Sequence, residues 1–322
     1  MSDNARWVRP LGSAAGDGWD VVIDGTVEGW AHTGLYAGRL AEGESREIPA
    51  GEWEHVVVPL SGSVAVAAQE WPVPGGAADG SVASSGTEHS SWKAELAGRE
   101  SVFAGPTDVA YVARDCSLTV TAVGGPARVA VCAARASARR TPAFRHVAAA
   151  EVPVELRGAG MASREVRNFG TPGVLDADSI IACEVITPAG NWSSYPPHKH
   201  DEERPGVEAE LEEIYYFETQ VESGSPAPEG ADPVGYQRVY GTDDRPIDVL
   251  AEVGSGDVVL VPHGWHGPAM AAPGYDLYYL NVMAGPGAER AWLICDDPAH
   301  GWVRDTWSDQ PVDPRLPLGG PR

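Results

Sequence analysis

The sequence has no long apolar run and little cysteine, and each shortage excludes a class of protein. None of its 322 residues lies in a run that approaches the roughly 18 consecutive apolar residues of a membrane-spanning helix. The first residues lack the apolar segment of a secretory signal, so we expect a cytoplasmic protein. Four widely spaced cysteines, with no Cys-x-x-Cys pair, each lie in an apolar stretch, which indicates buried free thiols in a reducing compartment.

Basic residues are also scarce. The chain has 23 Lys and Arg residues against 46 Asp and Glu residues, which gives a formal net charge of −23. Such a surface repels nucleic acid and anionic membranes, so we expect neither as a partner. An anionic small molecule would approach against the same field. Its site would therefore need a local Arg, Lys or metal ion.

Long stretches with helical periodicity are missing. Short β-branched runs separated by Gly and Pro instead predict antiparallel all-β structure, over 46–136 and again over 180–285. The length suggests two modules, which we place at 1–150 and 151–322. We expect a linker with one short helix over 137–153. Within the first module, a Gly- and Ser-rich stretch over 74–91 predicts a loop.

The two modules share an internal repeat. The string PAGEW at 49–53 matches PAGNW at 188–192, and each leads into a strand-like run. The same alignment places Ser117 opposite His266 and His55 opposite Glu213. Nothing in the first module corresponds to the His-Lys-His of the second. We therefore expect the first module to bind no metal.

Four side chains of the second module predict a metal site. His198 and His200 are two residues apart, so in a strand both imidazoles face one side. Glu213 opens the β-rich run EIYYFE, and His266 follows a second strand and a Pro-His-Gly turn. Three imidazoles and one carboxylate are a plausible ligand set for one divalent ion. Glu212, the neighbour of Glu213, remains an alternative as the carboxylate ligand.

The spacing of these histidines and of Glu213 resembles the motifs of a known protein family. His-x-His followed by Glu, with Gly-x5-Pro-x-Gly-x-His on a later strand pair, resembles the two-part cupin signature, and two such halves resemble a bicupin. More specifically, WSSYPPHKHDE, GDVVLVPHGWH and APGYDLYYLNVMAGP are similar to the 5-deoxy-glucuronate isomerases of inositol catabolism. The resemblance implies two tandem cupin (jelly-roll) barrels, with the metal site in the C-terminal barrel.

The resemblance also implies an activity. We expect an aldose–ketose isomerisation of 5-deoxy-D-glucuronate to 5-dehydro-2-deoxy-D-gluconate, with one divalent ion per chain. Zn or Mn is our first expectation, and Fe or Ni also fits the ligand set. A ketol-isomerase of another deoxy-uronate, a metal-dependent cupin oxygenase and a non-catalytic sugar-acid binding protein remain alternatives. The exposed strand edges of two barrels make a homo-oligomer the expected assembly.

A sugar-acid substrate needs a cationic partner for its carboxylate. Alternation in the strand YQRVY puts Tyr236, Arg238 and Tyr240 on one face, which we expect to point inward. Arg binds carboxylates bidentately, so Arg238 is our candidate, with a structural ion pair as its alternative. Arg238, Tyr240 and Tyr279 form the predicted substrate-contacting set. The catalytic base is left unassigned.

Overall fold

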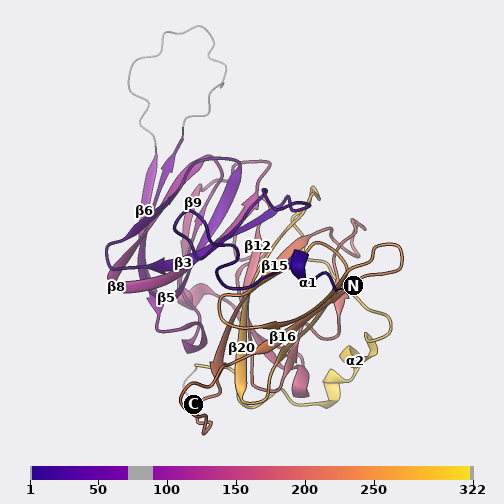
Figure 1. The fold of residues 1–322 in the computed structure, drawn as a ribbon. Helices are drawn as coiled ribbons and strands as arrows, with labels where there is room; N and C mark the ends of the chain where they lie inside the picture. Colours follow the sequence, from indigo (N-terminus) through magenta and orange to yellow (C-terminus); the bar gives the residue numbers. More distant parts are fainter. Residues whose placement is uncertain (1, 72–89, 320–322) are drawn as a thin grey trace, which may run out of the picture.

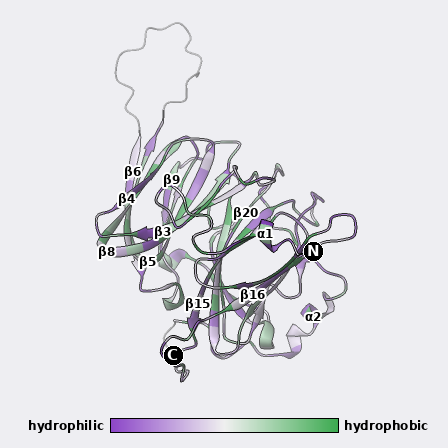
Figure 2. Cartoon of the chain, in the orientation of Figure 1, coloured by the Kyte–Doolittle hydropathy of each residue, from purple (hydrophilic) through white to green (hydrophobic). Residues whose placement is uncertain are grey.

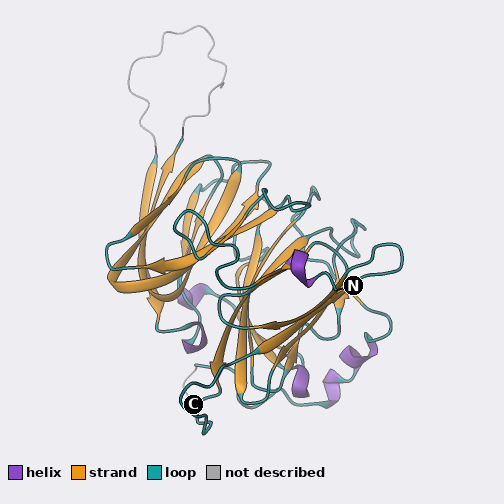
Figure 3. Cartoon of the chain, viewed as in Figure 1, coloured by secondary structure: helices purple, strands orange, loops and turns teal. Residues whose placement is uncertain are grey.

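Strands are the main regular secondary structure of the computed structural model, which describes residues 2–71 and 90–319 (Figures 1 and 3). The two α-helices, α1 (Asn4–Trp7) and α2 (Trp302–Asp305), are single turns. Among the described residues, four 3₁₀ turns complete the helical content: η1 (Val102–Ala104), η2 (Ala149–Glu151), η3 (Gly160–Ala162) and η4 (Trp307–Asp309). The predicted all-β class is confirmed. The loop expected over 74–91 lies outside the described residues except for its last two.

The N-terminal barrel is built from one eight-stranded sheet. Its strands run in the order β2-β3-β8-β5-β7-β9, with β4 beside β8 and β6 beside β5. They are β2 (Val21–Ile23), β3 (Thr33–Leu40), β4 (Ser45–Ile48), β5 (Trp53–Glu70), β6 (Ser91–Arg99), β7 (Val109–Val112), β8 (Cys116–Arg135) and β9 (Phe144–Val147).

Two long strands let this single sheet fold over itself. β5 and β8 pair along nearly their whole lengths, and the register shifts between Pro59 and Ser63. An extra residue in one strand of a pair bends that strand and increases its twist. Beyond the irregularity β5 pairs with β6, and before it with β7. The two ends of one strand pair therefore supply both walls of the barrel.

The C-terminal barrel is built from two sheets. The seven-stranded sheet, in the order β1-β18-β15-β20-β12-β11-β10, contains β1 (Val8–Arg9), β10 (Val154–Arg157), β11 (Arg164–Gly170), β12 (Ile181–Thr187), β15 (Glu212–Val221), β18 (Val258–Val261) and β20 (Tyr275–Ala284). The six-stranded sheet, in the order β17-β16-β19-β14-β21 with β13 beside β19, contains β13 (Trp192–Ser193), β14 (His198–Lys199), β16 (Gly235–Tyr240), β17 (Asp248–Val253), β19 (Trp265–Ala271) and β21 (Cys295–Asp296).

Two carboxylates at equivalent positions of the repeat, Glu54 and Glu212, connect the two barrels. Glu54 on β5 accepts backbone hydrogen bonds from residues 178–180, at distances of 2.9, 2.6 and 2.7 Å. Glu212 on β15 accepts them from residues 31–33, at 3.2, 2.6 and 2.6 Å. Each carboxylate thus binds the chain at the start of a strand of the opposite barrel, β12 for Glu54 and β3 for Glu212. The repeat seen in the sequence is visible here as an approximate symmetry of the interface.

Apolar side chains fill both barrels and the space between them. The buried hydrophobic residues form one continuous cluster that includes strands of all three sheets, and the apolar segments of the ribbon follow those strands (Figure 2). The interface also holds a buried ion pair between Arg99 and Glu184, whose side chains are 4% and 1% exposed. Separation of the barrels at this point would leave an uncompensated buried charge, which is costly.

Three expectations need correction. The segment 137–153 is not a plain linker: it contributes β9, which pairs with β7, and only a single 3₁₀ turn. The first residues of the chain, which we placed in the module 1–150, pack on the second barrel, because β1 pairs with β18. All four cysteines are free as expected, but Cys295 is only partly buried.

No helix among the described residues is long and apolar enough to cross a membrane.

Candidate metal centre and cavity

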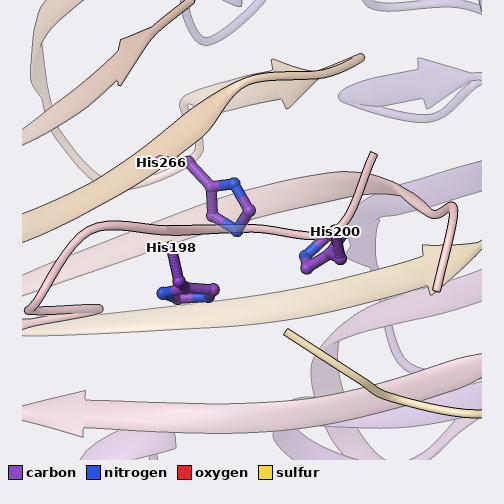
Figure 4. Close-up of side chains that lie close together, drawn as sticks. All are labelled: His198, His200 and His266. Carbon is purple, nitrogen blue, oxygen red and sulfur yellow. The ribbon is translucent and has the colours of Figure 1, made fainter. Parts of the chain in front are cut away.

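Three histidines meet between the two sheets of the C-terminal barrel. His198 on β14 is the direct cross-strand partner of His266 on β19, and His200 follows β14 on the same face. Their ligand nitrogens all lie within 4.8 Å of one another. Figure 4 shows the three rings gathered around one space. Among the described residues, this is the one His, Cys, Asp or Glu group with such spacing.

Glu213 completes the cluster from the facing sheet. Its Oε2 lies 3.0 Å from Nε2 of His200 and 3.0 Å from Nε2 of His266. Glu212 points the other way, into the contact between the barrels. Neighbouring residues in a strand face opposite sides, so only one of the two carboxylates can enter the barrel. The structure brings Glu213, and not Glu212, together with the histidines.

The imidazoles are oriented for ligation. Nδ1 of His200 is 3.1 Å from the carbonyl of Leu211, and Nδ1 of His266 is 3.1 Å from that of Gly264. A backbone acceptor at Nδ1 selects the tautomer that leaves Nε2 with a free lone pair. Nε2 of His266 is buried and has no hydrogen-bond partner of suitable geometry among the described residues. This donor set therefore fits a divalent ion.

The charge states of His198 and Glu213 also suit a cation. Burial lowers the pKa of His198, and the neighbouring His266 and His200 lower it further, so this ring is neutral at pH 7. Burial alone would raise the pKa of Glu213, but the neighbouring His200 and His266 lower it to about 2. The carboxylate is therefore ionised. A neutral imidazole and an anionic carboxylate are the forms that bind metal.

The insertion between the His-x-His and Glu213 is anchored by charge. Glu208 is fully buried and accepts hydrogen bonds from the Lys199 ammonium (2.7 Å) and the Asp201 backbone N–H (2.9 Å). Asp201 in turn accepts from the backbone N–H of Gly264 (2.8 Å), in the turn that carries His266. Lys199 points away from its two histidine neighbours and ties the ligand-bearing segments together. These contacts hold the histidines before any ion binds.

A cavity of about 220 Å³ opens beside the cluster. His198 and Glu213 lie in its wall, together with the hydroxyl-bearing side chains of Ser194, Tyr215 and Tyr279. Oγ of Ser194 is 3.1 Å from the Tyr279 hydroxyl and 3.3 Å from that of Tyr215. Burial raises the pKa of Tyr279 to about 12, so its hydroxyl remains protonated at neutral pH. The cavity suits a small polar molecule.

The expected inward face of YQRVY is wrong. The buried residues of β16 are Gly235, Gln237 and Val239, whereas Tyr236, Arg238 and Tyr240 are half-buried on the outer face. Arg238 pairs with Asp248 and donates to the carbonyl of Val249 at 2.9 Å. Tyr240 donates to Asp297. Neither Arg238 nor Tyr240 lines the cavity, so Tyr279 alone of the predicted substrate-contacting set does.

Sequence reasoning missed several cavity residues. Ser194 follows the matched PAGNW string and adopts a left-handed backbone (φ 49°), a conformation that aims its hydroxyl but has no signature in the sequence. Arg157, Arg164 and Arg304 also line the cavity. Arg157 and Arg164 come from the neighbouring strands β10 and β11, and Arg304 comes from α2. No spacing rule connects them to the histidines.

The first barrel lacks this arrangement at the matching positions. His55, aligned with Glu213, is fully buried, and burial lowers the pKa of its imidazole to about 4. Its cross-strand partners are Val112 and Ala133. Ser117, aligned with His266, is partly exposed and pairs with Gln69 on β5.

The fold and the cluster define a two-barrel cupin whose second barrel carries a three-histidine, one-carboxylate centre. The sequence profile of the KduI/IolB family matches residues 7–303, and the chain belongs to this family. An IolB-like protein from Salmonella typhimurium LT2 has a similar crystal structure, with a TM-score of 0.75 and 32% identity over 92% of this chain and 98% of that one. The oxalate decarboxylase of Lactobacillus farciminis, at 10% identity and a TM-score of 0.59, shares the fold over 90% of this chain and 88% of that one.

Curated relatives have a common name. The 5-deoxy-glucuronate isomerase of Bacillus licheniformis is 38% identical over 265 residues, which is 82% of this chain and 84% of the relative. That of Geobacillus kaustophilus is 48% identical over 178 residues, 55% of this chain. The match spans 59% of the length of the Geobacillus relative.

Proposed function

We propose that this chain is a metal-dependent aldose–ketose isomerase that converts 5-deoxy-D-glucuronate to 5-dehydro-2-deoxy-D-gluconate in myo-inositol catabolism. The proposal rests on one observation: the cluster of His198, His200, His266 and Glu213 adjoins a cavity of about 220 Å³ that is lined by hydroxyl groups. The name shared by relatives at 38–48% identity supports the substrate. The substrate is then a small sugar acid, which matches the size of the cavity.

The proposed ligands are His198, His200, Glu213 and His266, with one divalent ion per chain. Zn or Mn suits this mixed nitrogen and oxygen set, and Fe or Ni also fits. When bound, the ion would supply the positive charge that stabilises negative charge developing on the substrate oxygens during proton removal. Three neutral imidazoles and one carboxylate leave a net positive centre for that purpose.

The protein's own groups would position the sugar. The protonated Tyr279 hydroxyl can donate a hydrogen bond to a sugar oxygen, and Ser194 beside it holds that hydroxyl in place at 3.1 Å. The buried aromatic ring of Tyr215, 1% exposed, excludes water from the same side of the cavity. Exclusion of water strengthens each of these hydrogen bonds, because the local dielectric constant falls.

We assign catalysis to the C-terminal barrel, with the N-terminal barrel serving packing and assembly. The absence of a His-x-His counterpart in its sequence, and the interface contacts of Glu54, support this division. Elemental analysis of purified protein should then give about one divalent ion per chain, as a four-ligand site requires. A second ion that is lost on mutating His55 would contradict the division.

The direct test of the activity is turnover without oxygen. Metal-loaded protein is incubated anaerobically with 5-deoxy-D-glucuronate, and the loss of the aldehyde and gain of the ketone are followed by NMR. An isomerase needs no oxidant, so conversion should proceed at the aerobic rate. Conversion that requires O₂ would favour an oxygenase. Binding without conversion would favour a sugar-acid binding protein.

A further inference from the structure

Three guanidinium groups line the cavity beside the metal cluster. Arg157 ends β10 and Arg164 begins β11, and the two residues are direct cross-strand partners. Arg304 reaches the cavity from α2. Arg164 and Arg304 both stack over the ring of Trp307, with their guanidinium carbons 5.4 and 4.8 Å from its centroid. Like charges placed directly opposite on neighbouring strands destabilise a sheet, so this gathering calls for a compensating anion.

Two of the three arginines already have a carboxylate partner. Arg157 forms a two-pronged contact with Glu155, at 3.0 and 2.8 Å. Arg304 does the same with Asp296, at 2.7 and 2.6 Å. The charges of these two groups are therefore largely balanced by neighbouring side chains.

Arg164 differs from both. Its side chain is buried, with the residue 6% exposed, and its Nη1 donates to the carbonyl of Ala162 at 3.0 Å. Within residues 2–71 and 90–319, its side chain has no carboxylate partner and makes no other hydrogen bond. A buried cation without a paired anion is costly, and most such groups in folded proteins are paired. The chain has twice as many acidic as basic residues, so an acidic partner was readily available.

The charge of Arg164 persists at neutral pH. Burial lowers the pKa of its guanidinium to about 10, and Arg157 and Arg304 contribute to the decrease. A group with this pKa is still protonated in the cytoplasmic pH range. The free donors of a planar guanidinium match the two oxygens of a carboxylate, which an ammonium cannot do.

We propose that Arg164 is the carboxylate anchor of the active site, with the paired Arg157 and Arg304 lining the same cavity. This inference rests on the proposed function, because the anion it takes is the carboxylate of the sugar acid whose other end meets the metal cluster. The anchor selects acids over neutral sugars. It also offsets, at short range, the repulsion that a chain of net charge −23 exerts on an anionic substrate. Arg164 takes the role that the sequence had suggested for Arg238.

The test compares two substrates in matched variants. Arg164→Gln and Arg164→Lys are measured with 5-deoxy-D-glucuronate and with 5-deoxy-D-glucose, the neutral sugar that has a CH₂OH group in place of the carboxylate. Arg238→Gln is the control, since that arginine lies outside the cavity. Circular dichroism and metal content confirm that each variant is folded and loaded.

We expect Arg164→Gln to lower kcat/KM for the acid on the order of 10- to 100-fold, the range for a lost charge-assisted hydrogen bond. Its effect on the neutral sugar should stay within roughly threefold, because that substrate has no charge for the anchor to recognise. Arg164→Lys should recover part of the loss, and Arg238→Gln should behave as wild type. Equal losses on both substrates, or an unchanged rate with the acid, would overturn the inference.

A binding measurement separates this inference from the proposed function. Calorimetric titration with D-glucuronate is carried out on metal-loaded wild type and Arg164→Gln. Weaker binding to the variant, by at least about tenfold, supports the anchor even if wild type fails to isomerise 5-deoxy-D-glucuronate. Equal affinities, or no binding to wild type, would refute the anchor even if wild type is an active isomerase.

Discussion

Replacement of two adjacent carboxylates should give opposite results. Glu212→Gln and Glu213→Gln are equally conservative in shape, and both residues are more than nine-tenths buried. Strand alternation sends Glu213 to the histidines and Glu212 to the N-terminal barrel. We therefore expect Glu213→Gln to lose the metal with its fold intact. Glu212→Gln should keep the metal and lose stability.

The contacts of Glu212 and Glu213 determine how much stability and metal affinity each substitution should cost. Glu212 accepts three backbone hydrogen bonds from residues 31–33 and a fourth, at 3.1 Å, from the Thr33 hydroxyl. A glutamine retains one acceptor oxygen but turns an NH₂ toward these donors, so we expect a destabilisation of about 2–4 kcal/mol. Glu213 is a proposed direct ligand. Since changes around metal ligands already cost about 10- to 100-fold in affinity, its removal should cost at least about 100-fold.

The assay pairs elemental analysis with urea unfolding. Both variants and wild type are loaded with the same divalent metal, desalted and analysed for metal content per chain. Unfolding curves of the metal-free proteins then report stability without the contribution of the ion. Glu212→Gln protein without metal, together with fully loaded Glu213→Gln protein, would refute the assignment of the ligand.

Three further predictions follow from the same contacts. Glu54→Gln should destabilise the protein by about 2–4 kcal/mol without altering metal content, because Glu54 binds residues 178–180 as Glu212 binds its own partners; calorimetry on the metal-loaded protein checks this. Chelation should abolish turnover and lower Tm, and Mn or Zn added at 100 times its Kd should restore about 2.7 kcal/mol; an unchanged Tm would argue against a resident ion. Hydrogen bonds from Arg315 lower the pKa of Asp313 to about 2, below its ordinary value of 3.8. Ionised Asp313 therefore contributes to the free energy of unfolding above pH 4, and this contribution is lost as pH falls toward 2. The stability difference between wild type and Asp313→Asn should shrink over that window in urea unfolding, and a constant difference would contradict the assigned cause.

The all-β class and the repeat were predictable because they depend on local pattern. Alternation of apolar and polar residues reflects the pleat of each strand, and turn residues mark its ends. Both signals, like the matching strings PAGEW and PAGNW, lie within short segments. The order of strands across the sheets was less accessible. β1 pairs with β18, some 250 residues away, and no local signal in Val8 and Arg9 indicates that contact. The strand at Phe144–Val147 was hidden for the same reason, within a segment that resembled a linker.

The candidate site likewise contains residues that the sequence could place and residues that only the fold could place. His198 and His200 could be placed together because strand geometry alone puts residues two apart on one face, and the Pro-x-Gly-x-His pattern brought His266 into consideration. Alternation also grouped Tyr236, Arg238 and Tyr240 correctly as one face of β16. It could not determine which face that was. The structure turns Gln237 and Val239 inward, where Val239 lies opposite His266 on β19.

By itself, then, the sequence determined the strand-rich class, the duplicated plan and the residue types of the metal-type cluster, since all three follow from spacing within short segments. Only the tertiary structure decided which carboxylate faces the histidines, which face of β16 is buried and which of the three cavity arginines has no carboxylate partner among the described residues. Arg157, Arg164 and Arg304 meet at one cavity although up to 147 positions separate them (304 − 157). Convergence of that kind depends on how sheets pack, and packing is a property of the whole folded chain.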